Sequence, residues 1–247
     1  MLTAIVLLLL MAIFLMLAAI FYKVRKIHIA SFEIESIRLE VFTLFSQIEA
    51  TLALEKITKL SRPLPPTRGW AGSPDFLLKI AEELLKRKPT QVLECSSGIS
   101  TVVCARILQL NGHGHVYSLE HDSVYGQKTR ELLAQHGLEE WATVVDAPLS
   151  SSEGKQPWYT LSNLPQSANA IEVLIVDGPP STTSPLARYP AIPKLINRLG
   201  PAAFVIVDDA DRPEEQVILK KWHSEFPDFH QSNAFCEKGC VFLERQN

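Results

Sequence analysis

Five apolar runs in this sequence each end in an acidic residue. The runs have the length and composition of buried strands, and their acids are Glu94, Glu120, Asp146, Asp177 and Asp208. Because the carboxyl ends of parallel strands meet at one edge of a sheet, where open α/β sheets bind ligands, we expect these side chains to line one crevice. Acidic side chains are seldom buried without a partner. The repeated pattern therefore predicts a site for a ligand that carries cationic groups, hydroxyl groups or both.

The segment QVLECSSGIST, residues 91–101, indicates how the first of these acids is placed. A short strand ends at Glu94, a turn of small residues follows, and a helix begins near Ser100. This order is typical of the opening of a nucleotide-binding α/β unit. The dehydrogenase fingerprint G-x-G-x-x-G is absent, because Ser96 stands where a first glycine would be, and Gly98 is the only glycine of the turn. An acid before the turn suits a cationic ligand such as S-adenosylmethionine. An ordinary glycine-containing turn is the alternative.

The other acids have roles that follow from their chemistry. Glu120 lies 22 residues after Gly98, near the offset of about 20 residues at which a carboxylate binds ribose hydroxyls. Asp146 can accept a hydrogen bond from an adenine amino group, and Glu94 can face the ammonium group of the ligand. For each acid taken alone, a helix cap or a surface ion pair is the alternative, and Asp122 is expected to be such a cap.

Three aspartates suggest a metal site. Asp177 lies in VDGPP, and Asp208 and Asp209 lie in VDDAD. Carboxylates about 4 Å apart repel each other by roughly 4 kcal/mol per pair at an effective dielectric constant of 20, so either some are protonated or a cation lies among them. Mg²⁺ or Ca²⁺ suits oxygen ligands and would acidify a bound substrate hydroxyl, which would make Asp177 catalytic. The alternative is that the pair caps a helix or hydrogen-bonds the cofactor.

The elements that carry these residues alternate along the chain. Strands are expected at 91–94, 115–120, 142–146, 171–177 and 203–208, and helices at 75–88, 100–110, 123–136, 185–199 and 214–224. A closing hairpin is expected at 229–235 and 240–244. Such alternation predicts an α/β fold, a doubly wound Rossmann-like and mostly parallel sheet with a C-terminal antiparallel hairpin.

Two further segments are candidates for a substrate site. Trp158 and Tyr159, in the long loop 148–170, can form a wall of the site or a packed aromatic plug. Arg188 and Tyr189 follow Asp177 and can line the site of an acidic or sugar substrate.

Residues 91–209 resemble a class I S-adenosylmethionine-dependent methyltransferase. They are similar in particular to the small O-methyltransferase-like branch with a DGPP-type motif after the fourth strand, and the resemblance extends over residues 75–244. It implies S-adenosylmethionine as cofactor, held at Glu94, Ser96, Gly98, Glu120 and Asp146. Metal-dependent members place an acid after the fourth strand and an acid pair after the fifth, which correspond to Asp177, Asp208 and Asp209.

The N-terminal segment predicts a membrane anchor. Residues 2–22 are almost entirely apolar, and a helix of this length spans about 30 Å, the thickness of a bilayer core. Lys23, Arg25 and Lys26 follow directly, which orients the rest of the chain toward the cytoplasm by the positive-inside rule. A cleaved signal peptide is the alternative, but no basic residue precedes the apolar run. We therefore expect a single-pass anchor at residues 1–23.

A heptad pattern follows the anchor, within an amphipathic helix expected at 24–60. Apolar residues recur at the a and d positions of the heptad: Ile27, Ala30, Ile34, Ile37, Val41, Leu44 and Ile48. This pattern favours a juxtamembrane coiled coil that forms a homodimer, or else a helix that packs on its own domain or on the membrane surface. Residues 61–74 are rich in proline and glycine and are expected to be a linker, or a flap that uses Trp70, before a domain at 75–247.

Composition narrows the function classes. The net charge of −3 gives no electrostatic argument for nucleic acid, and the four cysteines show no zinc-ligand spacing. The expected function is a membrane-anchored methyltransferase that acts on a hydroxyl group of a sugar, a lipid or a small molecule. The alternatives are a nicotinamide-dependent oxidoreductase and a non-catalytic membrane scaffold.

Overall fold

The computed structural model describes residues 1–67, 71–151 and 156–246. The chain divides into two compact units, Met1–Ser46 and Gln47–Asn247. A single long helix, α1 (Leu2–Thr58), runs from the first unit into the second. Trp70, which we considered as part of a flap, lies outside the described residues.

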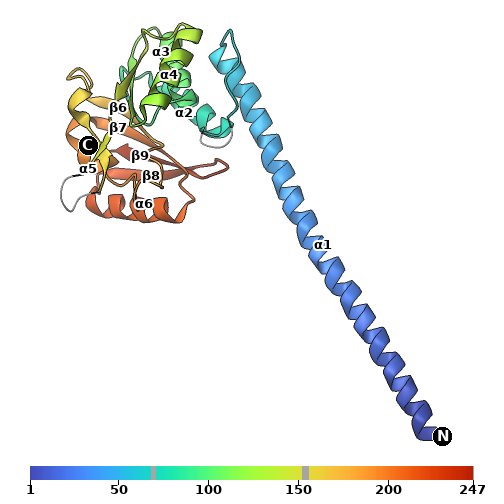
Figure 1. The fold of residues 1–247 in the computed structure, drawn as a ribbon. Helices are drawn as coiled ribbons and strands as arrows, with labels where there is room; N and C mark the ends of the chain where they lie inside the picture. Colours follow the sequence, from blue (N-terminus) through green and yellow to red (C-terminus); the bar gives the residue numbers. More distant parts are fainter. Residues whose placement is uncertain (68–70, 152–155, 247) are drawn as a thin grey trace. The chain divides into compact units, whose positions relative to one another are not determined.

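The second unit is built on one seven-stranded sheet with the order β3-β2-β1-β6-β7-β9-β8 (Figure 1). Strands β3, β2, β1, β6 and β7 run parallel to one another, and β9 is antiparallel to both β7 and β8. The strands are β1 (Gln91–Cys95), β2 (His115–Glu120), β3 (Ala142–Asp146), β6 (Ile171–Val176), β7 (Leu199–Asp208), β8 (Phe229–Ala234) and β9 (Cys240–Arg245). The mostly parallel sheet with a C-terminal antiparallel pair is therefore confirmed.

Helices cover both faces of this sheet (Figure 1). They are α2 (Pro74–Arg87), α3 (Ile99–Asn111), α4 (Ser123–His136), α5 (Ala191–Leu195) and α6 (Pro213–Glu225). Alternate strand residues point to opposite faces: Val173 and Ile175 pack with α2, α3 and α4, whereas Leu174 and Val176 pack with α5 and α6. Burial on both faces explains why these strands read as continuous apolar runs.

Proline shortens one expected helix. The sequence predicted a helix over 185–199, but the structure has only α5 followed by a 3₁₀ turn, Ile196–Arg198. Pro190 and Pro193 lack the backbone N–H that a longer helix would need. Strand β7 begins at Leu199, four residues before the expected start. The remaining residues of this range, 185–190, form turns instead of a helix.

The last three turns of α1 belong to the domain. The side-chain oxygen of Gln47 accepts a hydrogen bond from the backbone N–H of Asp75 at 3.2 Å. Leu54 is buried with the apolar residues of α2, and the guanidinium of Arg106 donates to the carbonyl oxygen of Thr58 at 2.7 Å. The predicted boundary at residue 75 stays a prediction, but the compact unit in the structure begins at Gln47.

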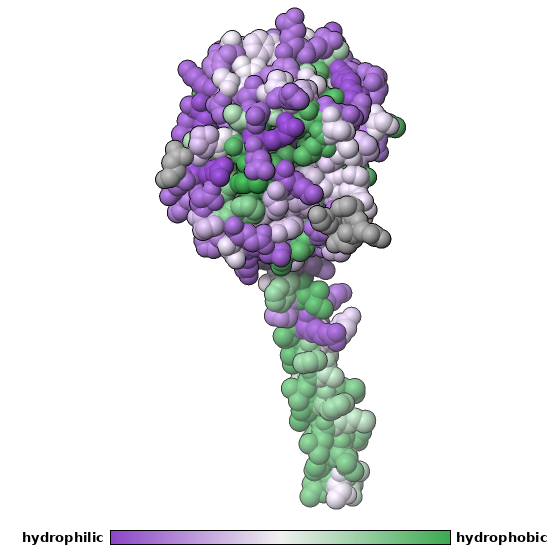
Figure 2. Space-filling view, turned by 90° about the vertical axis from the view of Figure 1, so that its left-hand side faces the viewer, coloured by the Kyte–Doolittle hydropathy of each residue, from purple (hydrophilic) through white to green (hydrophobic). Residues whose placement is uncertain are grey.

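The first unit is the N-terminal portion of α1, whose surface is hydrophobic near the N-terminus and includes hydrophilic residues farther along the helix (Figure 2). Its N-terminal part is long and apolar enough to cross a membrane, a test that a signal sequence also passes. The heptad residues Ile27, Ile34 and Ile37 are all exposed within this unit. A coiled coil through these residues stays a prediction.

Candidate active site

Glu94 organises the turn after β1. Its carboxyl group is completely buried, and Oε2 accepts hydrogen bonds from the hydroxyl groups of Thr101 and Ser118, each at 2.6 Å. The Thr101 oxygen in turn accepts a hydrogen bond from the backbone N–H of Gly98 at 3.0 Å. Burial raises the pKa of Glu94, and hydrogen bonds from Ser100, Ser118 and Thr101 partly oppose that shift. Glu94 thus holds the turn in place through Oε2. Its other oxygen, Oε1, is buried and has no hydrogen-bond partner among the described residues, and the contact with the ligand expected from the sequence stays a prediction.

The turn itself leaves open space. Gly98 has φ of 151°, and apart from the adjacent residues no described atom lies within 4 Å of the position that a Cβ would occupy. Ser96 also has a positive φ, 132°, a conformation that costs a side chain about 1–3 kcal/mol. Ser96 therefore adopts a backbone conformation that glycine usually occupies. The turn therefore leaves room for a ligand beside Gly98.

Glu120, at the end of β2, is held as an ionised carboxylate. Oε2 accepts a hydrogen bond from the hydroxyl of Ser97 at 2.7 Å, and Oε1 accepts one from the backbone N–H of Asp122 at 2.9 Å. The Nδ1 atom of His121 lies 3.1 Å from Oε1. Burial raises the pKa of Glu120, but the hydrogen bonds, of which the one from His121 has the largest effect, lower the pKa by more than burial raises it. The net shift of the pKa is therefore downward. As predicted, Asp122 caps α4, where it accepts bonds from two backbone N–H groups.

Asp146 lies next to Glu120 at the same sheet edge. The two residues are paired across β2 and β3, and a Cβ placed on Gly126 of α4 would lie 3.4 Å from the Glu120 Cγ and 3.5 Å from the Asp146 Oδ1. The Asp146 side chain is 60 % exposed and forms a 2.6 Å ion pair with Arg130. The structure thus brings Glu120 and Asp146 together, with Asp146 nearer the solvent.

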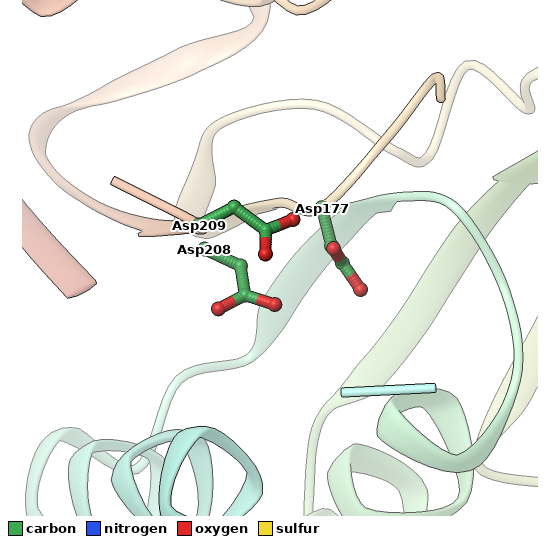
Figure 3. A group of neighbouring side chains, drawn as sticks. All are labelled: Asp177, Asp208 and Asp209. Atoms are coloured by element: carbon green, nitrogen blue, oxygen red, sulfur yellow. The ribbon is translucent and has the colours of Figure 1, made fainter. Parts of the chain in front are cut away.

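The three aspartates predicted as metal ligands also lie together. One carboxylate oxygen from each of Asp177, Asp208 and Asp209 lies within 4.8 Å of the others. Asp177 follows β6 and Asp208 ends β7, and Figure 3 shows the three side chains gathered together, with the carboxyl group of Asp209 directed toward Asp177. Burial raises the pKa of Asp208 well above its usual range, with further increases from Asp177 and Asp209. The three residues that the sequence predicted as metal ligands are therefore neighbours in the structure.

An arginine lies inside this cluster. The Nη2 atom of Arg188 is 2.8 Å from Oδ2 of Asp209 and 3.3 Å from Oδ1 of Asp177, and Nη1 donates to the carbonyl oxygen of Asp208 at 2.9 Å. Burial raises the pKa of Asp177 to about 6, while the charge of Arg188 opposes that rise. The sequence placed Arg188 at the substrate, whereas the structure buries it among the acids.

This arrangement bears on whether a divalent cation fits. Two of the three carboxylates already contact a guanidinium, and Oδ1 of Asp209 also lies 2.9 Å from Arg212. A metal ion that bridged Asp177 and Asp209 would meet the positive charge of Arg188. With Arg188 in this position, the donor set does not fit a divalent cation.

The comparisons with known proteins agree with this geometry. Residues 93–210 match a family model described as a methyltransferase domain. These residues form a methyltransferase domain. The match runs from β1 to the acid pair at the end of β7, and so includes every predicted site residue. The resemblance to class I methyltransferases stated from the sequence is confirmed.

Solved structures share the fold of this methyltransferase. A methyltransferase from Geobacter sulfurreducens is 16 % identical, with 80 % of this chain and 90 % of that chain covered and a TM-score of 0.52. The O-methyltransferase from Bacillus cereus in complex with SAH is 15 % identical, with 81 % and 91 % covered and a TM-score of 0.53. The SAH-bound methyltransferase from Podospora anserina is 13 % identical, with 80 % and 88 % covered and a TM-score of 0.53. Among curated proteins, none matches this chain.

A small hairpin brings Tyr159 to the segment that follows β6. Strands β4 (Leu149–Ser150) and β5 (Trp158–Tyr159) are antiparallel, and Tyr159 is buried, with no hydrogen-bond partner for its hydroxyl among the described residues. A Cβ placed on Gly178 would lie 2.6 Å from that hydroxyl and 3.0 Å from the carbonyl oxygen of Cys95. The hydroxyl therefore lies between the carboxyl ends of β1 and β6. The sequence named Tyr159 as a wall, but no sequence signal placed it against Gly178.

We expect Gly178→Ala to lower the free energy of unfolding by about 1–3 kcal/mol, because the added methyl group overlaps the Tyr159 hydroxyl. Urea unfolding of the full chain in detergent micelles measures this change. In the double variant Gly178→Ala/Tyr159→Phe the hydroxyl is absent, so part of the lost stability should be recovered. The recovery should be partial because the carbonyl oxygen of Cys95 still lies 3.0 Å from the added methyl group. A double variant no more stable than Gly178→Ala would show that Tyr159 is not the obstacle.

Proposed function

We propose that this protein is a membrane-anchored S-adenosylmethionine-dependent methyltransferase that transfers a methyl group to oxygen. The observation that carries the proposal is the open turn at Gly98, with the ionised Glu120 at the end of the next strand. The SAH complexes of the Bacillus and Podospora neighbours support the choice of cofactor.

The cofactor would extend along the edge formed by β1, β2 and β3. The carboxylate of Glu120 would accept hydrogen bonds from both ribose hydroxyls, and Asp146 would accept one from the adenine amino group. The methionine part would lie beside Gly98, on the turn that Glu94 and Thr101 hold in position. This order leaves the methyl group facing the crevice between β1 and β6.

The transfer needs alignment and the removal of one proton. The acceptor oxygen would form a bond to the methyl carbon while the carbon–sulfur bond breaks, and the bonding electron pair would go to sulfur. Asp177 is the acid at the end of β6, and its side chain is 15 % exposed. Its carboxylate would accept the proton of the acceptor hydroxyl.

The anchor and the heptad residues define where this chemistry would take place. The apolar N-terminal helix would hold the catalytic domain at the cytoplasmic face of a membrane. The acceptor would then be a hydroxyl of a sugar, a lipid or a small molecule that reaches this surface. The exposed heptad face at Ile27, Ile34 and Ile37 would pair with a second copy of the chain.

Calorimetric titration of the full chain with S-adenosylmethionine in detergent micelles tests the proposal. We expect saturable binding that SAH competes for and that a nicotinamide dinucleotide does not. Competition by the dinucleotide would favour an oxidoreductase. If no adenosyl compound binds at millimolar concentration while the chain still dimerises, a scaffold is the better interpretation.

A further inference from the structure

The acid cluster contains a positive charge of its own. Asp177, Asp208 and Asp209 meet within 4.8 Å, and Glu215 of α6 adds a fourth buried carboxyl group. A cluster of this kind requires either a cation or protonation. The side chain of Arg188 is nine-tenths buried or more and lies among all four residues. We propose that the guanidinium of Arg188 takes the place of a divalent metal ion, so that this methyltransferase works without one.

The contacts of Arg188 reproduce what a bridging ion would do. Its Nη2 atom joins Asp177 and Asp209, at 3.3 and 2.8 Å, and its Nε atom lies 3.8 Å from Oε1 of Glu215. A divalent ion would need carboxylate oxygens at about 2.0–2.6 Å, and an ion between Asp177 and Asp209 would occupy the space of Nη2. The two cations therefore exclude each other by both volume and charge.

The chain holds Arg188 in this position from both sides. The backbone N–H of Ala191 donates to the carbonyl oxygen of Arg188 at 3.1 Å, which begins the short turn of α5. The indole N–H of Trp222 in α6 donates to the carbonyl oxygen of Tyr189 at 2.9 Å. These bonds fix the backbone at Arg188, and the guanidinium itself is held by its burial and by its ion pairs with Asp177 and Asp209.

Arg188 is thus a positioning residue that acts through Asp177. By contacting one oxygen of Asp177, it fixes the carboxyl group at the end of β6, where the acceptor hydroxyl would arrive. Arg212 contacts the same cluster from outside, and its side chain is 46 % exposed. Arg212 provides a matched control, because its removal takes away one positive charge and leaves the interior of the cluster filled.

The test is metal binding without cofactor, which does not depend on the proposed function. The full chain in detergent micelles is titrated with MnCl₂ by calorimetry, as the wild type, Arg188→Ala and Arg212→Ala. We expect no saturable binding to the wild type or to Arg212→Ala. For Arg188→Ala we expect saturable Mn²⁺ binding, with a dissociation constant at least about tenfold below the highest Mn²⁺ concentration used. Additional replacement of Asp177 by Asn should abolish the new site.

Two outcomes would overturn the inference. One is saturable Mn²⁺ binding to the wild type that Asp177→Asn removes; the other is a folded Arg188→Ala variant that binds no Mn²⁺. If Arg188→Ala does not fold, the wild-type titration decides. Methyl transfer by the wild type is then measured after exhaustive chelation and should be unchanged. Loss of transfer after chelation would refute the metal-free site alone, whereas failure of the untreated wild type to bind S-adenosylmethionine would refute the proposed function.

Discussion

Glu120→Ala is expected to weaken S-adenosylmethionine binding by about 10- to 100-fold, because a hydrogen bond to a charged group contributes roughly 1.5–3 kcal/mol. The carboxylate is ionised and lies at the sheet edge beside the open turn. Its loss removes the acceptor for two ribose hydroxyls. Calorimetry on the full chain in detergent micelles gives the dissociation constant.

Glu139→Ala serves as the control for this measurement, because it removes an exposed carboxylate between α4 and β3. Its affinity should equal that of the wild type. Glu120 also accepts hydrogen bonds from Ser97 and Asp122, so the unfolding curve of Glu120→Ala must show that the protein is folded. A folded Glu120→Ala variant with unchanged affinity would remove the ribose contact from the proposed site.

Leu54→Ala is expected to lower the free energy of unfolding by about 2–5 kcal/mol, the cost of a cavity in a packed core. Leu54 is 2 % exposed and packs with Phe76, Leu77 and Ile80. The result would show that the end of α1 is a structural part of the catalytic domain. Urea unfolding of the full chain, followed by tryptophan fluorescence, measures the change.

Leu52 is the matched comparison, because it lies in the same helical segment and is 61 % exposed. Leu52→Ala should change the stability by no more than about 0.5 kcal/mol. Equal effects of the two substitutions would mean that residues 47–58 do not pack on the domain in solution.

The sequence alone determined the sheet and the place of most acids. Apolar runs that end at Glu94, Glu120, Asp146 and Asp208 mark strands buried on both faces, and this signal is local. The prediction therefore needed no knowledge of which strands are neighbours. The DGPP segment and the turn at Gly98 likewise carried the family resemblance in consecutive residues.

Tertiary structure decided what each of these groups contacts. Arg188 is eleven residues from Asp177 and twenty-one from Asp209, and only the return of the chain between β6 and α5 brings its guanidinium between them. Tyr159 reaches Gly178 from a separate hairpin, and Leu54 meets α2 across the linker. Sequence patterns record which residues are apolar or acidic, because those properties belong to single side chains. Contacts between distant segments depend on packing of the whole domain, and so only the folded chain shows that an arginine occupies the predicted metal site.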